Sequence, residues 1–550
     1  MITKINQKKW LKVLFTFHCS LFISVALMSC ADDYNTVPQS SLPAADQTLW
    51  QNISENDQLQ QFAKILQKTG YADELQNSKV YTVWAPLDNT YDAEALLDGS
   101  NDEVLSRFVK NHIACYSHVA KTNGQERIYT LNGKSYAFSA DSYGEQALAD
   151  RSLPCVNGVL HTIHGRQQFY PNLYEHIMTA TGIDSVQSYF KRFERTYLDE
   201  KASILGPVVG GRQTYVDSVM VTTNNLFGRL RAYIQVEDSS YTALLPTDKA
   251  WIKAYDRIRP YFRYGAKTVS EDLSVENINT KKTRNIDAQL FGDSLTRNAI
   301  MANIFFNNND YYNKWLVDEA YTLNTDTLLS TGRTLLPNGP ELISQTIEQQ
   351  RMSNGVARQV DSLAFTTDTW APEITIAGIN GSTRPRLLSA MATNVRIDDP
   401  EELNVEKGEI VSYVDLIPTG TRSLPDVYFY LPNILSTTYE IYAVIVPADI
   451  KKGYEGDVKP NKFLATLTYC DANGNLRTET LGEQFINDPS KVDYVLLGTK
   501  TFPIAYRGLG SEYHPSLELK ANLRIFNKEE MDTYDRELRI AAIVLKPVKK

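Results

Sequence analysis

The stretch that decides the fold is CVNGVLHTIHG at residues 155–165, because a related phrase, SNGVARQVDSL, returns at residues 353–363. Each phrase has Asn-Gly-Val followed by a run of strand-like composition. Asn and Gly both tolerate a positive φ, so each Asn-Gly pair predicts a tight turn that starts a buried strand. The second phrase lacks both histidines of the first, which indicates that the fold does not need them.

The landmarks around the two phrases occur in the same order. An expected opening helix begins at Leu49 before the first phrase and at Leu173 before the second. A strand that ends in proline follows, as TVWAPLDNTY at residues 82–91 and as ALLPTDKAW at residues 243–251. An amphipathic helix then precedes the Asn-Gly strand in each copy. This shared order predicts two tandem domains of the α+β class.

These phrases resemble the motifs of the fasciclin domain. TVWAPLDNTY is similar to the first family motif, Asn-His at residues 111–112 stands where the family has Tyr-His, and VNGVLHTI resembles the second motif. The second copy diverges, since Arg358 replaces the histidine of that motif. The resemblance implies two twisted β-wedges with helices packed along them. It assigns a structural role to Ala85, Pro86, Asn89, His112, Asn157, Gly158, His161, Pro246, Asn354 and Gly355.

The N-terminal segment predicts an exported lipoprotein. Residues 1–29 combine a lysine-rich start with an apolar run, which is typical of a signal peptide and too short for an ordinary membrane span. The run ends in LMSC, similar to a bacterial lipobox, so Cys30 is the expected lipidation site. An ordinary secretory signal with a chance cysteine is the alternative. An acidic pair after Ala31 resembles the surface-export tag of Bacteroidota lipoproteins, so we expect an outer-membrane protein that faces the cell exterior.

The C-terminal third has a different pattern from the two copies. Short β-rich runs separated by turns follow residue 366 and predict a β-sandwich. The second copy is also longer than the first, with expected insertions at residues 203–236 and 267–285. We therefore predict a signal peptide at 1–29, a lipidated Cys and tether at 30–46, fasciclin-like domains at 47–170 and 171–365, and an all-β, sandwich-like domain at 366–550.

Composition and motifs favour binding over catalysis. The net charge of −9 gives no electrostatic support for a nucleic-acid partner. No nucleophile elbow, P-loop or HExxH motif is present, and no cofactor or metal site is expected. Two interpretations of Cys115 and Cys155 remain open: a disulfide between them, or two separate buried thiols.

Two aromatic clusters are the candidate binding residues. Aromatic rings beside guanidinium or amide groups suit sugar or peptide ligands, although packing in the core or at an interface would use the same residues. The first cluster, RPYFRYG at residues 259–265, contains Tyr261, Phe262 and Tyr264. The second, NNNDYYNKW at residues 307–315, contains Tyr311, Tyr312 and Trp315.

Three functions are open at this point. The first is a non-catalytic surface lipoprotein that mediates adhesion, or binds a glycan, peptide or matrix ligand, through its fasciclin-like domains. The second is an accessory subunit of a TonB-dependent outer-membrane importer for glycans or peptides. The third is a secreted hydrolase, which would need a cleft with converging acids or a nucleophile. The resemblance favours the first, and the lipid anchor is compatible with the first two.

Overall fold

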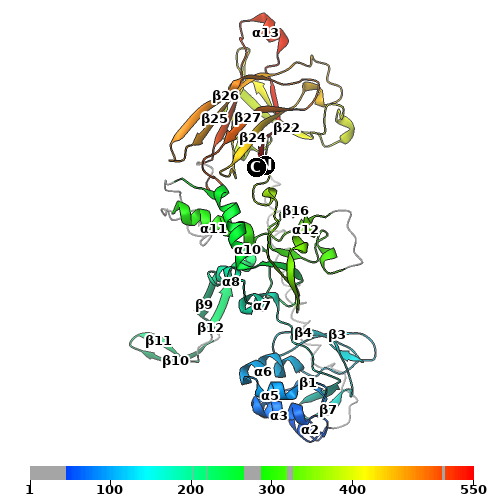
Figure 1. Ribbon diagram of the computed structural model, residues 1–550. Coiled ribbons are helices and arrows are strands. Elements are labelled where there is room, and N and C mark those ends of the chain that lie inside the picture. Colours follow the sequence, from blue (N-terminus) through cyan, green and yellow to red (C-terminus); the bar gives the residue numbers. More distant parts are fainter. Residues whose placement is uncertain are drawn as a thin grey trace, which may run out of the picture. The chain divides into compact units, whose positions relative to one another are not determined.

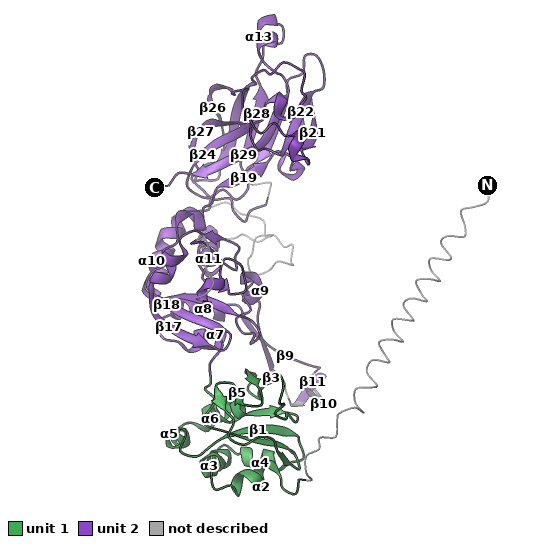
Figure 2. Cartoon of the chain, turned by 90° about the vertical axis from the view of Figure 1, so that its right-hand side faces the viewer, with its two compact units in different colours: residues 1–169 green, residues 170–550 purple. Residues whose placement is uncertain are grey.

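The computed structural model describes residues 45–201, 203–217, 220–265, 287–318, 326–510 and 514–549. The chain forms two compact units, residues 1–169 and residues 170–550 (Figure 2). Helices and strands are mixed, and the C-terminal region is rich in antiparallel sheets, which confirms the predicted α+β class (Figure 1). The predicted signal peptide, Cys30, most of the tether and the insertion at 267–285 lie outside the described residues. Among the described helices, none has the length and apolar character that crossing a membrane requires.

The first unit packs short helices and a small second sheet around a four-stranded sheet. Its helices are α2 (Leu49–Ser54), α3 (Gln60–Lys68), α4 (Tyr71–Gln76), α5 (Ala93–Asp98), α6 (Asn101–Arg107) and η1 (Val109–His112). Its strands are β1 (Tyr81–Pro86), β2 (Ile113–Cys115), β3 (Glu126–Tyr129), β4 (Ser135–Phe138), β5 (Ser142–Tyr143), β6 (Gln146–Ala147), β7 (Leu153–Cys155) and β8 (Gly158–Ile163). The main sheet has the order β2-β1-β8-β7, and β1 pairs with β8 in parallel.

Strand β1 is buried along its whole length, so its sequence is largely apolar rather than alternating; its buried Thr82 hydroxyl donates to the carbonyl of Tyr116 at 2.8 Å. Val83 belongs to the hydrophobic cluster that the helices cover, together with Phe62 of α3. Trp84 belongs to a second cluster, with Phe138 and Tyr143 from the small sheet β3-β4-β5-β6. Successive side chains of a strand point to opposite faces, so one strand contributes to two cores.

The second unit begins with a region of helices and strands. Its helices are α7 (Leu173–Thr179), α8 (Asp184–Lys191), α9 (Leu226–Leu230), α10 (Asp248–Ile258), η2 (Arg259–Phe262), α11 (Ala288–Met301), η3 (Lys314–Leu316), α12 (Gly339–Ser344) and η4 (Thr367–Thr369). Its strands are β9 (Glu194–Leu198), β10 (Ile204–Val209), β11 (Arg212–Asp217), β12 (Met220–Asn224), β13 (Tyr241–Pro246), β14 (Phe305–Asn307), β15 (Leu328–Leu329), β16 (Leu335–Leu336), β17 (Thr346–Met352) and β18 (Gly355–Val360).

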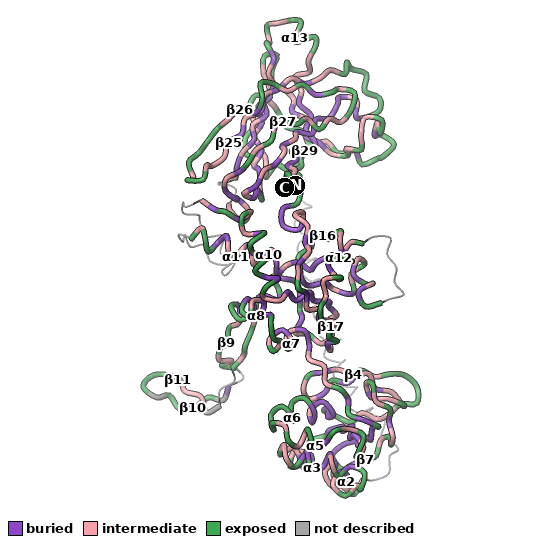
Figure 3. The backbone as a smooth tube through the Cα atoms, viewed as in Figure 1, coloured by how far each residue is buried: buried purple, intermediate pink, exposed green. Residues whose placement is uncertain are grey.

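The main sheet of this region repeats the topology of the first unit. Its order is β14-β13-β18-β17, with β13 parallel to β18 and antiparallel to β14. The register also matches, because Tyr81 pairs with Gly158 in the first unit and Tyr241 pairs with Gly355 in the second. The insertion predicted at residues 203–236 contributes to two small antiparallel pairs, β9 with β12 and β10 with β11, whose described residues are largely exposed (Figure 3).

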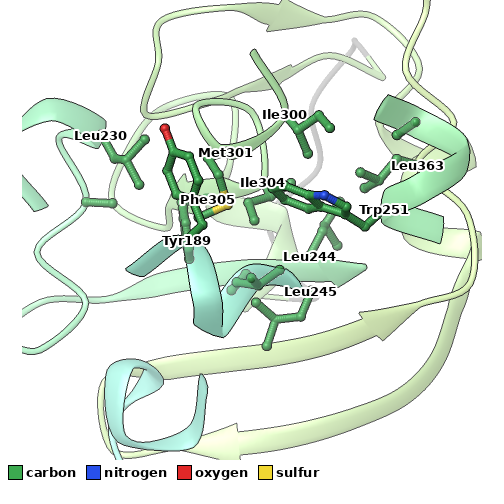
Figure 4. Close-up of a cluster of buried hydrophobic side chains, with 14 of the residues drawn as sticks. Tyr189, Leu230, Leu244, Leu245, Trp251, Ile300, Met301, Ile304, Phe305 and Leu363 are labelled. Carbon is green, nitrogen blue, oxygen red and sulfur yellow. The ribbon is translucent and has the colours of Figure 1, made fainter. Parts of the chain in front are cut away.

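A single hydrophobic core fills this region of the second unit. Trp251 of α10 and Phe305 of β14 pack with residues of α8, α9 and α11 (Figure 4). The same core also takes in Leu435 and Ala505 from the C-terminal region. Within the second unit, the helical region and the start of the β-rich region are therefore joined by shared apolar packing.

The C-terminal region is a pair of sheets over a common core. The sheet orders are β21-β22-β29-β24-β27, with β19 beside β29, and β20-β23-β28-β25-β26. The elements are β19 (Ile374–Ala377), η5 (Gly381–Thr383), β20 (Arg386–Leu388), β21 (Ala390–Arg396), η6 (Pro400–Glu402), β22 (Ser412–Pro418), β23 (Asp426–Tyr430), β24 (Thr438–Ile445), η7 (Ala448–Ile450), β25 (Lys462–Cys470), β26 (Leu476–Ile486), β27 (Asp493–Thr501), β28 (Ser516–Ala521), α13 (Lys528–Thr533) and β29 (Leu538–Pro547). Inward-facing residues of both sheets, such as Ile441 and Leu517, form one cluster.

Candidate functional site

The asparagine of each Asn-Gly phrase is buried and joins separate segments of its unit by hydrogen bonds. The side-chain Oδ1 of Asn157 accepts from the amide of Leu49 at 2.8 Å, and its Nδ2 donates to the carbonyls of Leu75 and Asn77, both at 2.7 Å. It thereby joins the start of the opening helix to the segment that precedes the central strand. The Asn157 side chain uses its amide donors and its carbonyl acceptor at the same time. No apolar side chain could form these hydrogen bonds.

Asn354 makes the corresponding contacts in the second unit. Its Oδ1 accepts from the amide of Leu173 at 2.9 Å, and its Nδ2 donates to the carbonyl oxygens of Ile234 and Val236 at 2.8 and 3.0 Å. Leu173, like Leu49, is the first residue of the opening helix. The prediction that the asparagine is used because it tolerates a positive φ was wrong, because neither Asn157 nor Asn354 has a positive φ.

The glycine after each asparagine is required by its backbone conformation and by close packing. The φ angles of Gly158 and Gly355 are 150° and 144°. A Cβ at Gly158 would lie 1.8 Å from the carbonyl oxygen of Tyr81, and one at Gly355 would lie 1.8 Å from that of Tyr241. Each glycine therefore lets the last strand start directly against the central strand.

The two motif histidines of the first unit are buried and fully bonded. The Nδ1–H of His112 donates to the Phe108 carbonyl at 2.7 Å, and Nε2 accepts from the Gln167 amide at 2.9 Å. His161 accepts from the Ser152 amide through Nδ1 at 3.0 Å and donates through Nε2 to the carbonyl of residue 118 at 2.9 Å. Burial lowers the pKa of each imidazole to about 4, so both rings are neutral at pH 7.

The remaining motif residues also lie in packed positions. Ala85 is fully buried, and Pro86 and Pro246 end the two central strands. Asn89 has a φ of 63° and accepts a hydrogen bond from Gln61 of α3. Asn tolerates this left-handed backbone better than most residues, which explains its place in the turn after the first strand.

The first aromatic cluster, residues 259–265, lies against the β-rich region and not at the surface. Phe262 and Tyr264 are only 1% and 8% exposed. The hydroxyl of Tyr264 donates to the carbonyl of Arg507 at 2.7 Å, and Tyr261 meets Trp370 edge to face with ring centroids 5.8 Å apart. Phe262 and Tyr264 therefore belong to the core and do not form an exposed binding surface, although Phe262 also lines the cavity described below.

The second aromatic cluster, residues 307–315, is divided between surface and core. Tyr311 is 62% exposed and meets Tyr312 edge to face at 5.4 Å. Trp315 is partly buried and packs against the hydrophobic core of the unit. Asn313 fixes the loop, because its amide donates to the carbonyls of Asn307 and Leu329 at 2.9 and 2.8 Å. Of the six aromatic candidates, Tyr311 has its side chain mostly in solvent.

A cavity of about 360 Å³ opens beside the first aromatic cluster. Four arginines line it, and we call it the arginine pocket: Arg229 in α9, Arg231 at the C-cap of α9, Arg333 in the turn between β15 and β16, and Arg507 after β27. Helix α11 and Trp370 complete its wall. No carboxylate belongs to the described residues that line this pocket, although the whole chain has a net charge of −9.

The arginines are fixed by their surroundings. Arg507 donates to the carbonyl of Trp370 at 3.0 Å, and burial lowers its pKa, although a guanidinium remains charged at neutral pH. The guanidinium of Arg229 lies 5.3 Å from the ring centroid of Phe193. Arg231 and Arg333 are exposed and form no ion pair with any residue that the structure describes. Their charges are therefore available to a ligand.

The turn that carries Arg333 is held tightly against α11. The amide of Gly332 donates to the carbonyl of Ala302 at 3.0 Å, and the amide of Arg333 donates to the Ser330 carbonyl at 2.9 Å. A Cβ at Gly332 would lie 2.5 Å from the Ala302 oxygen, so only glycine permits this approach. Arg333 is consequently presented on a rigid turn.

Sequence reasoning missed this pocket. Its four arginines come from three separate segments, because Arg229 and Arg231 share the end of α9, and together they form no recognisable motif. Across the described ranges, no group of His, Cys, Asp and Glu is arranged to hold a metal ion. Cys115 and Cys155 are free thiols in β2 and β7, the two outer strands of one sheet, so the disulfide reading was wrong.

Comparison with known proteins identifies one domain. Residues 57–165 match the fasciclin domain family, so the first unit contains a fasciclin domain. No curated protein matches the chain.

Similar solved structures include a FAS1 domain pair from the insect cell adhesion molecule fasciclin I, at 11% identity and a TM-score of 0.20, covering 57% of this chain and 99% of that one. The xylan-binding CBM22-2 domain of Paenibacillus barcinonensis Xyn10C is 8% identical, with a TM-score of 0.21 over 32% of this chain and 99% of that one. The CBM22-1–GH10 modules of a Clostridium thermocellum xylanase, complexed with xylohexaose, are 9% identical, with a TM-score of 0.21 over 32% of this chain and 28% of that one. TM-scores this low carry no argument about a ligand.

Proposed function

We propose that this protein is a non-catalytic binding protein of the outer cell surface, which mediates adhesion or captures a partner. The observation that carries the proposal is the fasciclin domain at residues 57–165, because domains of this family are generally involved in adhesion or binding. Its motif residues support this reading, since His112 and His161 use both ring nitrogens in structural hydrogen bonds.

The proposal includes a second fasciclin-like domain at the start of the second unit. The two main sheets share strand order and register, which supports a common origin. Asn157 and Asn354 also tie the same two places, namely the first residue of the opening helix and the segment before the central strand. A match in topology, register and buried polar contacts favours a repeated domain over chance similarity.

The proposal also includes a lipid anchor at Cys30. The lysine-rich start, the apolar run and the phrase LMSC support it, followed by an acidic pair that favours export to the surface. Acyl chains contribute about 0.8 kcal/mol per buried CH₂, so a lipidated cysteine with several chains holds a protein on a membrane without a spanning helix.

The experiment that tests the proposal is purification from native membranes. The protein is tagged at its C-terminus, outer membranes are solubilised gently, and co-purifying proteins are identified, with Cys30→Ala as the matched control. A lone protein, or one bound to an extracellular ligand, is the expected result. A stoichiometric outer-membrane transporter would replace adhesion with the accessory role in nutrient import. Hydrolysis of glycans or peptides by the purified protein would contradict the non-catalytic proposal.

A further inference from the structure

Three buried side-chain atoms in the lining of the arginine pocket have no hydrogen-bond partner in the part of the chain that the structure describes. Thr331, Thr369 and Trp370 line the pocket and are 7%, 6% and 2% exposed. The hydroxyls of both threonines and the indole Nε1 of Trp370 are buried, and each has no hydrogen-bond partner among the described residues. Buried polar groups are normally bonded, and leaving one unbonded is unfavourable.

The partners that these atoms need can be deduced from their chemistry. An indole N–H only donates, so it requires an acceptor, whereas each threonine hydroxyl can donate and accept. The ring of Trp370 already has two neighbours, since the guanidinium of Arg257 lies 5.1 Å from its centroid and Tyr261 meets it edge to face. The unpartnered groups therefore call for an oxygen-rich ligand that brings both hydroxyls and acceptor atoms.

The positive charge of the arginine pocket indicates that its ligand also carries a negative charge. Guanidinium groups match carboxylate, sulfate and phosphate oxygens with paired hydrogen bonds. Arg231 and Arg333 are exposed, whereas Arg507 lies deeper and is already bonded to a backbone carbonyl. With no carboxylate on the lining, an anion is the charge that this pocket accepts.

The backbone at two of the arginines supports a role for their side chains. Arg231 and Arg333 have φ angles of 53° and 65°, in the left-handed region where glycine or asparagine is favoured. Arginine is a costly choice at these positions, and strained backbone of this kind gathers at ligand sites. Both residues sit on the same pocket, one at the end of α9 and one in the turn before β16.

The volume limits the ligand to about one sugar ring. A cavity of about 360 Å³ corresponds to roughly a dozen waters at their share of liquid volume. That space suits a hexose with one anionic substituent and is small for an oligosaccharide. We infer that the arginine pocket binds an anionic monosaccharide unit, one hydroxylated ring that carries a carboxylate or a sulfate, with Arg231 and Arg333 on the anionic group and the unpartnered polar atoms on the ring oxygens.

This inference goes beyond the proposed function and does not depend on the lipid anchor. The purified protein could bind an anionic sugar even if it were not located at the cell surface. It could equally be located at the cell surface without binding an anionic sugar. If both hold, the ligand of the surface protein is an acidic or sulfated glycan.

Isothermal titration of the purified full-length chain in detergent micelles tests the inference. The probes are D-glucuronate, D-glucose 6-sulfate, inorganic sulfate and neutral D-glucose, each to about 10 mM. The expected result is saturable binding of at least one anionic sugar, tighter than inorganic sulfate and glucose and weakened by added salt. Equal affinity for inorganic sulfate would show an adventitious ion only, and no binding of any probe would overturn the inference.

Matched variants assign the binding to the pocket. Arg333→Gln should weaken the anionic sugar about tenfold or more, because a charge-assisted contact is lost. Arg396→Gln, at an exposed arginine of β21, is the charge control and should leave the affinity unchanged. Equal affinity in the Arg333 and Arg396 variants would overturn the assignment.

A second pair of variants separates binding from folding. Arg333→Gly relieves a left-handed backbone and should keep or raise the melting temperature while it loses binding. Ser389→Gly makes the same change at a φ of 60° outside the pocket lining, and it should keep both melting temperature and affinity. Full affinity in Arg333→Gly would overturn the role of this side chain.

Discussion

Replacing Asn157 by glycine separates two explanations of the repeated Asn-Gly phrase. If the asparagine only favoured a turn, glycine would serve at least as well, because it adopts turn conformations without a steric cost. If the side chain ties three backbone groups together, glycine removes the tie and leaves those groups buried. The structure supports the second explanation, with contacts to Leu49, Leu75 and Asn77 at 2.7–2.8 Å.

The expected loss can be estimated from these contacts. Each hydrogen bond contributes about 1 kcal/mol net, and a buried partner that stays unbonded costs about 1–3 kcal/mol instead. Glycine also adds about 0.5–1 kcal/mol of backbone freedom to the unfolded chain. Asn157→Gly should therefore lower the free energy of unfolding of the first unit by about 4 kcal/mol, a large part of the stability of a typical domain.

Hydrogen exchange followed by mass spectrometry measures the protection of backbone amides in each unit separately. Amides of β1 report on the first unit, and amides of β13 report on the second. Asn157→Gly should accelerate exchange in β1 and leave β13 unchanged, whereas Asn354→Gly should do the reverse. Asn473→Gly is the control, because this exposed asparagine lies in the turn between β25 and β26. Unchanged protection of β1 in Asn157→Gly would refute the argument.

Three further predictions concern the pH dependence and packing of the units. Burial lowers the pKa values of His112 and His161 to about 4. The free energy of unfolding of the first unit should therefore fall by about 3 kcal/mol per histidine as the pH falls from about 6.5 to 4. A denaturation midpoint that stays constant over this pH range would contradict this prediction. Burial raises the pKa of Asp415 to about 6, so its contribution to stability is present below about pH 4 and is lost as the pH rises through 6. Asp415→Asn should therefore raise the unfolding free energy of the β-rich region by about 2 kcal/mol at pH 8 and by much less at pH 4, measured by urea denaturation at both values. Gly332→Ala places a methyl group 2.5 Å from the carbonyl oxygen of Ala302, so it should lower the melting temperature. It should also displace Arg333, and a loss of anionic-sugar binding would show that displacement.

The sequence was informative where a structural requirement repeats along the chain. The two Asn-Gly phrases marked the start of β8 and β18, and the proline-ended phrases marked β1 and β13. Buried strands and turns leave such signals because sterics restrict the residue types. The role of the asparagine was not visible, because its partners at Leu75 and Ile234 lie in segments that share no motif.

The arginine pocket left no signal of this kind. Arg229, Arg333 and Arg507 are far apart in the sequence, and only the tertiary fold brings them to one cavity. The aromatic residues of 259–265 were conspicuous in the sequence for another reason, since large rings such as Phe262 fill the core where the helical and β-rich regions meet. Composition identifies a cluster but does not decide whether it faces solvent or another part of the chain.

Antibody labelling of intact cells tests whether this protein is anchored at the outer surface. Wild-type cells are compared with cells that express Cys30→Ala, before and after permeabilisation, with an antibody raised against residues 326–510. If Cys30 anchors the protein at the surface, intact wild-type cells are labelled and intact Cys30→Ala cells are not. Labelling that requires permeabilisation, or that is unchanged by Cys30→Ala, would contradict the claim.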